Sequence, residues 1–382
     1  MAVSRRSFVR SLGVGGAGAL ALPSWLSARG HEAGTHLDDA LAAERWQGAS
    51  PIKLDSNENP NGPAPAAMRA VQQAFRRASL YPARGEQAVR DAIAQAQGLQ
   101  PDQVMVGSGS GEVLRLAVQA FCTPTRHLVA ARPTFETPAR YAGVLGLPVR
   151  EVPVDKSLAL DLDGMLAQVR GAGLVFLCNP NNPTGHVHGA KAVTAFIEAA
   201  LRADPEVVIL VDEAYHEFVA DPAYATSVPL IARHPRVVVS RTFSKIYGLA
   251  GMRLGYAMGA PATLARMERL RLENGVGSLT QVAGLAALGD TALVQREREG
   301  NRAALEFTAR WFTDAGYAVV PSQTNFVLVD IRRDAAAFKD SCAAQGVLVG
   351  RVFPPLTQHT RISIGTMDEM RRAVAILGRV LS

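Results

Sequence analysis

The chain has 382 residues, of which 48% are hydrophobic and 19% are charged, a composition typical of a globular protein with a substantial core. Its 40 basic and 34 acidic residues give a net charge of +6, and without the three arginines among residues 1–28 the balance is 37 against 34, or +3. This mild charge, with no basic stripe that carries interleaved aromatic residues, argues against nucleic acid as a partner. Cys122, Cys178 and Cys342 are far apart in the sequence and show no metal-ligand spacing, so we expect buried, reduced thiols and no metal site.

Residues 1–28 are typical of a segment that is removed during export. The run Ser4-Arg-Arg-Ser-Phe-Val-Arg10 precedes an apolar stretch from Leu12 to Leu22 and resembles a twin-arginine signal. The apolar stretch is shorter than the roughly 20 residues that a membrane-spanning helix needs. We therefore expect recognition by the twin-arginine export machinery and a periplasmic or secreted location. The alternative is a chance basic N-terminus on a cytoplasmic protein.

Apolar runs alternate with helical patterns through the first two thirds of the chain. Strands this apolar, separated by helices, predict a mostly parallel sheet that is covered on both faces. Ligands bind beyond the carboxyl ends of the strands in such sheets, and the polar motifs fall there. We expect strands at residues 104–106, 127–131, 174–178, 207–211 and 237–240, and helices at residues 86–97, 112–121, 138–145, 190–201, 262–271 and 282–298.

The pattern changes after residue 300, which indicates a second, smaller α+β domain. It comprises a helix to residue 315, short strands near residues 317–320, 326–329, 347–349 and 361–364, and a final helix over residues 368–381. The predicted organisation is therefore a signal peptide (1–28), an N-terminal segment that joins the small domain (29–74), a large domain (75–300) and the C-terminal small domain (301–382).

Two motifs follow predicted strands of the large domain. Gly107-Ser-Gly-Ser-Gly-Glu112 opens a helix, where free backbone N–H groups form an anion cradle, and its predicted phosphate contacts are Gly109, Ser110 and Gly111. Alone this is a weak signal, because glycine-rich turns often serve only close packing. Pro133-Thr-Phe135 ends the next strand, and Phe135 either stacks on a planar ring or belongs to the core.

Two further motifs place polar groups after very apolar strands. The turn Asn179-Pro-Asn-Asn-Pro-Thr-Gly185 projects an amide, for which we choose Asn182, as a donor to a phenolate oxygen. Asp212 ends the apolar run Val208-Ile-Leu-Val211, so an ionised carboxylate there needs a positive partner such as a protonated pyridine nitrogen. Tyr215 is placed to hydrogen-bond a ring hydroxyl. The alternative for Asp212 is a helix N-cap.

Lys245 is the central residue of the fifth motif. It follows the β-type run Val237-Val-Val-Ser240, close to the hydroxyls of Thr242 and Ser244, and Arg253 comes eight residues later. These three side chains are suited to hold a phosphate, and Lys245 is placed to form a Schiff base with an aldehyde cofactor. Burial and a nearby cation suppress the charge of a lysine and make its amine nucleophilic. An isolated exposed lysine is the alternative, and the other four motifs argue against it.

With these motifs in this order, residues 50–382 resemble the fold-type I pyridoxal-phosphate enzymes of the class I/II aminotransferases, and most of all the histidinol-phosphate aminotransferase group. The resemblance implies pyridoxal 5′-phosphate as the cofactor and an α/β fold with a mostly parallel seven-stranded sheet and a smaller α+β domain. It also implies transfer of an amino group between an amino acid, or an amine like histidinol phosphate, and a 2-oxo acid. The matching motifs are Asn57-Glu-Asn-Pro60, Tyr81-Pro82, Asn182-Pro-Thr-Gly185, Asp212-Glu-Ala-Tyr215, Ser244-Lys245 and Arg361-Ile-Ser-Ile-Gly-Thr366.

The resemblance also assigns roles by position. Lys245, Asp212 and Tyr215 are the expected catalytic residues, and Tyr81 is expected to reach the cofactor phosphate of a neighbouring subunit, which implies a homodimer. The expected substrate-binding residues are Arg361, Asn59 and Arg351, and Arg361 suits a carboxylate as well as a phosphate.

The chain departs from the family pattern at two places. Gly111 replaces a usual acidic residue, and Gly350 stands where an arginine often follows the strand, so that Arg351 is displaced by one position. A decarboxylase or lyase of similar fold is the alternative within enzymes, and a cofactor-binding regulator is the alternative outside them.

Overall fold

The computed structural model describes residues 51–82 and 85–382, and Ile52–Ser382 form one compact unit. The predicted export signal lies outside the described residues. Within them, no helix has the length and apolar character needed to cross a membrane, and no three His, Cys, Asp or Glu side chains gather as metal ligands would. The three cysteines are free and buried, as expected.

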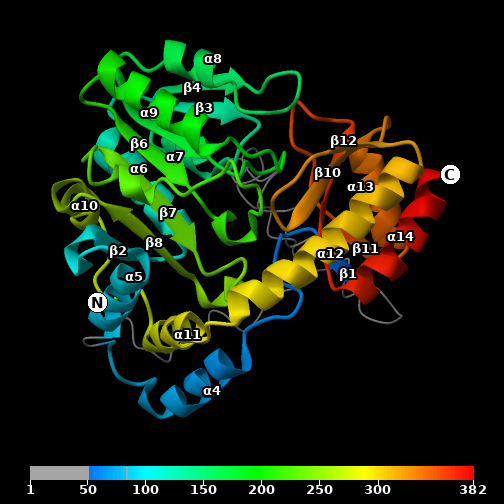
Figure 1. The fold of residues 1–382 in the computed structure, drawn as a ribbon, viewed down its shortest axis with the longest axis horizontal. Coiled ribbons are helices and arrows are strands. Elements are labelled where there is room, and N and C mark those ends of the chain that lie inside the picture. Colours follow the sequence, from blue (N-terminus) through cyan, green and yellow to red (C-terminus); the bar gives the residue numbers. More distant parts are fainter. Residues whose placement is uncertain (1–50, 83–84) are drawn as a thin grey trace, which may run out of the picture. The chain divides into compact units, whose positions relative to one another are not determined.

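A mixed sheet of seven strands forms the centre of the large lobe, in the order β2-β8-β7-β6-β5-β3-β4 (Figure 1). Only β8 runs antiparallel to its neighbours, which confirms the predicted mostly parallel α/β sheet. The strands are β2 (Val104–Ser108), β3 (His127–Arg132), β4 (Val149–Pro153), β5 (Ala172–Cys178), β6 (Val208–Asp212), β7 (Val237–Thr242) and β8 (Leu254–Gly259).

Two of these strands, β4 and β8, were not expected from the sequence. The edge strand β4 is largely exposed, so it lacks the apolar run that marks the inner strands. The sequence of β8, Leu-Gly-Tyr-Ala-Met-Gly, contains two glycines, which weaken a strand signal. Gly255 is required there, because a Cβ at this position would lie 2.1 Å from the backbone nitrogen of Ser110 at the start of the next-door helix.

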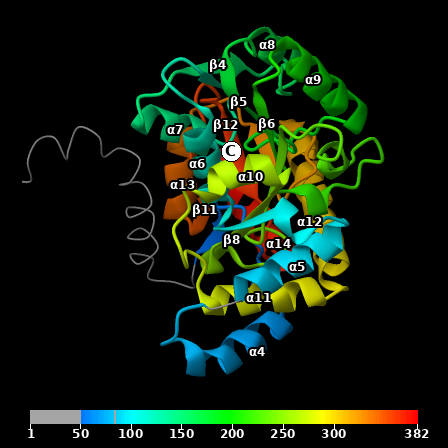
Figure 2. The same cartoon turned by 90° about the vertical axis from the view of Figure 1, so that its left-hand side faces the viewer.

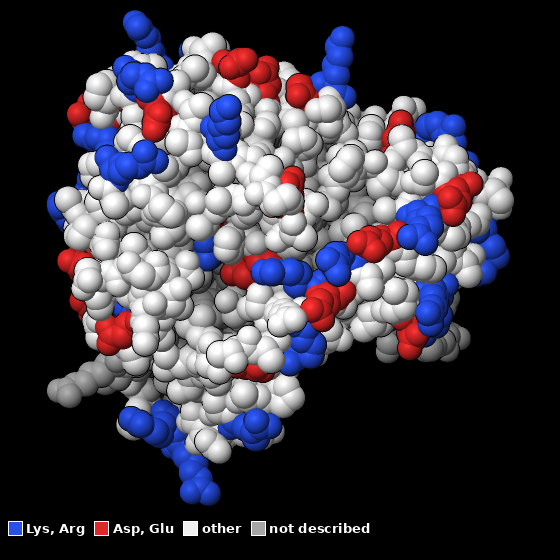
Figure 3. Space-filling model, in the orientation of Figure 1, with Lys and Arg blue, Asp and Glu red and all other residues white. Residues whose placement is uncertain are grey.

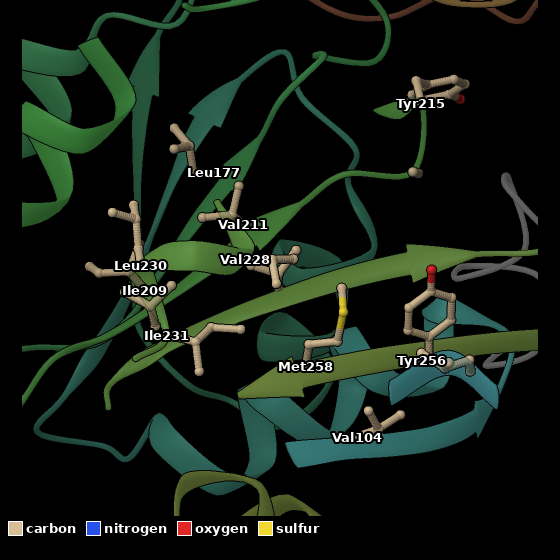
Figure 4. Close-up of a cluster of buried hydrophobic side chains, with 14 of the residues drawn as sticks. Val104, Leu177, Ile209, Val211, Tyr215, Val228, Leu230, Ile231, Tyr256 and Met258 are labelled. Carbon is tan, nitrogen blue, oxygen red and sulfur yellow. The ribbon is translucent and has the colours of Figure 1, made fainter. Parts of the chain in front are cut away.

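Alternate residues of the central strands enter two separate hydrophobic clusters. Ile209 and Val211 of β6 belong to one cluster, which Figure 4 shows together with Leu177 of β5. Val208 and Leu210 belong to the other. Both faces of the sheet are therefore buried, because helices cover each of them. The helices of this lobe are α4 (Pro65–Ala74), α5 (Gly85–Gln97), α6 (Ser110–Phe121), α7 (Thr137–Val144), α8 (Leu162–Ala167), α9 (Ala190–Ala203), α10 (Pro261–Glu268) and α11 (Ser278–Gly289).

The single helix predicted over residues 282–298 was wrong. The structure has two helices there, α11 and α12 (Leu293–Asp314), and Asp290 between them has non-helical dihedral angles. The second helix continues through residue 300, where the large domain was predicted to end. Helix α11, by contrast with α12, stays in the large lobe and packs against α4, and the two lie side by side in Figures 1 and 2.

The C-terminal lobe combines two small sheets with helices. One sheet has the order β12-β10-β9, and the other pairs β1 in parallel with β11, with Ile52 opposite Val347. The N-terminal segment is thus joined to this lobe by backbone hydrogen bonds. The elements are β1 (Ile52–Leu54), β9 (Ala318–Val320), β10 (Phe326–Asp330), α13 (Ala335–Ala344), β11 (Val347–Val349), β12 (His359–Ser363) and α14 (Met367–Leu381), and short 3₁₀ helices occur at Phe75–Arg77, Pro101–Gln103, His216–Phe218, Val228–Leu230 and Ala250–Met252.

On the face drawn in Figure 3, basic and acidic side chains are interspersed rather than gathered by sign. Along α12 they form pairs such as Arg302 with Glu306 at 4.0 Å. Exposed pairs of this kind add little stability, but they keep a long helix soluble.

Two polar pairs join the ends of β6 and β7, where Asp212 lies opposite Ser240. Ser240 Oγ donates to Asp212 Oδ1 at 2.8 Å. The next residue of each strand faces the other side of the sheet. There Arg241 donates through Nε and Nη2 to Glu213 Oε2, at 3.1 and 2.9 Å, and both side chains are at least 97% buried.

Replacement of Arg241 by methionine should destabilise the protein by about 3–5 kcal/mol, because it leaves the Glu213 carboxylate buried without its cation. Urea unfolding of the cofactor-free protein measures this loss. The double change Arg241→Met with Glu213→Leu should be less harmful than Arg241→Met alone, since no uncompensated charge remains. A wild-type denaturation midpoint for Arg241→Met would contradict the assigned role of this pair.

Candidate active site

Lys245 lies three residues beyond the end of β7, with its amine end enclosed by protein although part of the side chain is exposed. Its Nζ donates to the carbonyl oxygens of Asn57 at 2.9 Å and Ser56 at 3.4 Å, and it lies 5.7 Å from the centre of the Tyr215 ring. Burial, helped by the cation of Arg361, lowers the pKa of Lys245 to about 7. Near neutral pH a large fraction of this amine is therefore uncharged and can act as a nucleophile or a base.

Asp212 and Tyr215 lie at and just beyond the end of β6. Asp212 is 2% exposed, and burial raises its pKa to about 6 although Ser240 donates a hydrogen bond to it. A buried carboxylate in this setting calls for a cationic partner. The Tyr215 hydroxyl accepts a hydrogen bond from Asn57 Nδ2 at 3.0 Å, and burial raises its pKa as well. Tyr215 consequently keeps its own proton for donation to another acceptor.

The start of α6 forms the expected anion cradle. Gly109 is the N-cap with φ of 76°, and no side chain caps the helix, so the backbone N–H groups of Ser110 and Gly111 are left for an anion. A Cβ at Gly109 would lie 2.2 Å from Nη2 of Arg253, whose guanidinium also donates to Ser244 Oγ at 3.4 Å. A cation, a hydroxyl and a helix N-terminus therefore converge on one place, which is the chemistry of a phosphate site.

Three other residues that were predicted to bind the cofactor have different surroundings. Thr242 Oγ1 donates to Ser244 Oγ at 2.9 Å, so both hydroxyls belong to one network. Gly111 lies in the first turn of α6, where an added Cβ would meet nothing within 4 Å. Phe135 is half-buried against the second hydrophobic cluster, two residues before the start of α7, so the structure gives it both a core contact and a partly exposed ring.

Arg361 of β12 is a buried cation whose charge acts on Lys245. Its Nη1 donates to Asn182 Oδ1 at 2.7 Å and its Nη2 to the Asp55 carbonyl at 2.6 Å, while its buried Nε has no partner. Burial lowers the pKa of Arg361 to about 10. The Asn182 amide is oriented by this contact, which leaves its NH₂ group as the available donor face.

Gly350 packs closely against Arg361 at the position where an arginine was expected from the family pattern. A Cβ at this position would lie 2.6 Å from the carbonyl oxygen of Arg361 and 3.3 Å from its Nε, so only glycine fits against Arg361. Arg351 follows, and its Nη2 donates to Glu136 Oε2 at 2.6 Å.

Two predicted residues lie apart from this cluster. Tyr81 is 85% exposed and borders a surface hollow lined by residues 78–82, 251–252 and 277–280. Asn59 donates through Nδ2 to the Ile246 carbonyl at 2.9 Å and to Glu297 Oε2 at 3.1 Å. Its amide nitrogen is therefore occupied by Ile246 and by a residue of α12.

Sequence reasoning did not assign Asn57, Ser240 or Asn325 to the site. Asn57 has φ of 52° and contacts both Lys245 and Tyr215, while Asn325 Nδ2 donates to the Asn57 carbonyl at 3.0 Å. The motif Asn57-Glu-Asn-Pro60 was a usable signal for the first of these. Nothing in the local sequence around the other two distinguishes them from ordinary strand-end residues.

The family profile described as aminotransferase class I and II matches residues 49–377. The chain is 39% identical to a histidinol-phosphate aminotransferase of Symbiobacterium thermophilum, over 86% of this chain and 90% of that protein. It is 35% identical to a histidinol-phosphate aminotransferase of Halalkalibacterium halodurans, over 87% of this chain and 89% of that protein.

Solved structures agree with this result. The histidinol-phosphate aminotransferase of Sinorhizobium meliloti in complex with pyridoxal-5′-phosphate superposes with a TM-score of 0.82 at 30% identity, covering 89% of this chain and 94% of that chain. A Thermus thermophilus aspartate aminotransferase double mutant has a TM-score of 0.81 at 21% identity, covering 94% and 99%, and supports the fold alone.

Proposed function

Since the chain belongs to the class I and II aminotransferases and uses pyridoxal 5′-phosphate, we propose an amino donor for it. The proposed donor is histidinol phosphate or a closely similar phosphate-bearing amine. The proposed acceptor is a 2-oxo acid. The observation that carries the choice of an anionic donor is the buried guanidinium of Arg361, whose Nε has no hydrogen-bond partner. It lies close enough to Lys245 for the positive charge of Arg361 to lower the pKa of the lysine. The names of the relatives favour phosphate as that anion.

The cofactor fits the residues that are present. When bound, pyridoxal phosphate supplies an aldehyde and an electron-withdrawing ring that stabilises negative charge at the donor's amine-bearing carbon. For its phosphate we assign the N-terminus of α6, through Gly109, Ser110 and Gly111, with the side chains of Thr242, Ser244 and Arg253. For the ring we assign Asp212 to the pyridine nitrogen, where a cation meets the need of the buried carboxylate.

The other proposed roles follow from free donors and acceptors. Tyr215 and Asn182 donate to the ring hydroxyl oxygen, since each has its acceptor atom already engaged, by Asn57 and by Arg361. Phe135 provides the stacking face. Lys245 carries the proton from the donor carbon and returns it, which requires an amine that is uncharged near neutral pH, and the lowered pKa meets this requirement.

The donor can be tested in a single half-reaction of the purified holoenzyme. Histidinol phosphate should convert the bound cofactor to its amine form at a concentration about 10- to 100-fold lower than histidinol, because a charge-assisted hydrogen bond contributes about 1.5–3 kcal/mol. The absorbance of the cofactor reports the conversion. Lys245→Ala should show no conversion, and equal half-saturation by the two donors would reject phosphate recognition.

A homodimer with shared sites is the second part of the proposal. Phe75, Leu80 and Tyr81 are 60%, 59% and 85% exposed within one stretch of chain, and the hollow beside Tyr81 measures about 520 Å³. Apolar side chains grouped in this way favour burial against another protein surface. We assign this surface to the dimer interface, with Tyr81 reaching the cofactor phosphate of the partner.

Subunit mixing tests this sharing of residues. Lys245→Ala and Tyr81→Ala variants, each inactive alone at a limiting cofactor concentration, should recover about one quarter of wild-type activity after mixed refolding, because half of the dimers are mixed and each has one intact site. Self-mixed samples of either variant are the controls. No recovery in the mixture, with dimers present by light scattering, would place Tyr81 outside the neighbouring site.

Export through the twin-arginine pathway is the third part of the proposal. It rests on Arg5 and Arg6 and the apolar stretch after them, which lie outside the described residues. Arg5→Lys combined with Arg6→Lys should retain the full-length protein in the cytoplasm while leaving its activity unchanged. Fractionation of cells that carry either form measures this, and unchanged delivery of the lysine variant would reject the pathway.

A further inference from the structure

Two guanidinium groups converge on Phe353 in the C-terminal lobe. The central carbon of the Arg351 guanidinium lies 4.2 Å from the centre of this ring, and that of Arg361 lies 4.8 Å from it. Phe353 is 4% exposed, so the ring is a fixed platform for both side chains. We call this group of three residues the anion subsite, and its two guanidinium groups lie close enough for the charge of Arg351 to act on Arg361.

One of the two charges is already paired. Arg351 Nη2 contacts Glu136 Oε2 at 2.6 Å, and the two side chains are 43% and 39% exposed. Arg361 is buried and keeps its Nε without a partner. In the structure, the anion subsite therefore has one guanidinium whose hydrogen bonds go only to neutral groups, that of Arg361, and one that a carboxylate has neutralised, that of Arg351.

Glu136 reaches Arg351 from the other lobe. It is the residue before α7 and follows Phe135, the predicted ring-stacking residue, whereas Arg351 follows β11. Although it stands at a helix N-cap position, its side chain makes no capping hydrogen bond. The Glu136 carboxylate binds Arg351 and does not bind the backbone N–H groups of α7. Because the Glu136 side chain is 39% exposed, water can hydrate it when Arg351 moves away.

The proposed reaction requires one site to accept two different anions in turn. An aminotransferase binds its donor and its acceptor alternately in the same place. A phosphate monoester carries nearly two negative charges at neutral pH, while the carboxylate of a 2-oxo acid carries one. A subsite with a fixed charge of +2 favours the first, and one with a fixed charge of +1 is better matched to the second.

We propose that Glu136 sets the charge of the anion subsite and is thereby a specificity-determining residue. Paired with Arg351, it leaves Arg361 alone to bind a singly charged carboxylate. A doubly charged phosphate draws Arg351 away from Glu136 and is bound by both guanidiniums, which the stronger Coulomb attraction of a dianion favours. The pairing thus lowers the affinity for phosphate and leaves that for carboxylate nearly unchanged. This inference rests on the proposed function for the identity of the donor.

An exposed ion pair is often without measurable effect, so the test needs a matched pair elsewhere. Arg132 and Glu151 provide it, because Nη1 and Oε2 are also 2.6 Å apart and the side chains are 51% and 39% exposed. That pair joins β3 to β4 and has no part in the subsite. Glu151→Gln removes the same charge from a similar ion pair and controls for a general change in the protein's field.

The experiment measures binding of inorganic phosphate and of acetate to the holoenzyme by calorimetry, at constant ionic strength. The bound cofactor fills the phosphate cradle of α6, so the probes report on the anion subsite. Glu136→Gln should tighten phosphate binding about two- to fivefold, with acetate binding changed less than phosphate binding. Glu151→Gln should change neither, and Glu136→Gln should tighten phosphate binding less in an Arg351→Gln background, where no second guanidinium can be released.

Three outcomes would overturn the inference: equal changes for phosphate and acetate, a gain that is as large without Arg351 as with it, or an equal gain in Glu151→Gln. Steady-state kinetics adds a second readout, since Glu136→Gln should lower KM for a phosphate donor at unchanged kcat and leave the acceptor's KM as it was. The calorimetry does not require histidinol phosphate to react. A donor that fails in the half-reaction would therefore reject the proposed function, while the binding data would still decide the role of Glu136.

Discussion

The register between β6 and β7 is the constraint on which the site depends. Asp212 faces Ser240 across these strands, and the following residues, Glu213 and Arg241, form a buried ion pair on the opposite face. Tyr215 comes two residues after Glu213, and Lys245 comes four residues after Arg241. Two oppositely directed polar pairs therefore hold the Asp212 carboxylate, the tyrosine and the lysine in one frame. A slip by one residue would reverse both faces and bury charges among aliphatic side chains.

Asn57 connects this frame to the rest of the molecule. It donates to Tyr215, its carbonyl accepts from Lys245 and Asn325, and its side-chain oxygen accepts from Ser363 of the C-terminal lobe. Its left-handed backbone, which costs a non-glycine residue about 1 kcal/mol or more, is held by these contacts. The Lys245 amine is thus enclosed by a segment that lies outside the large sheet.

The parts predicted correctly from the sequence are those with a local signal. The apolar runs of β5, β6 and β7 and the polar motifs at their ends indicated the sheet, and the resemblance added the cofactor. The strand β8 was missed because Gly255 serves a close approach to Ser110, a reason that exists only in three dimensions. The contact between Asn57 and Lys245 spans 188 residues and the Glu136–Arg351 pair spans 215, so neither leaves a trace in local spacing.

The pairing of β1 with β11 also fixes an order of assembly. Ile52 to Leu54 have no strand partner until Val347 to Val349 have been synthesised, and the carbonyls that receive the Lys245 amine follow directly after β1. A nascent chain that lacks its last lobe already contains every strand of the large sheet, because those strands lie within residues 104–259. It cannot yet enclose the lysine. The pocket around the Lys245 amine is therefore completed late in translation, when residues 347–349 become available to pair with β1.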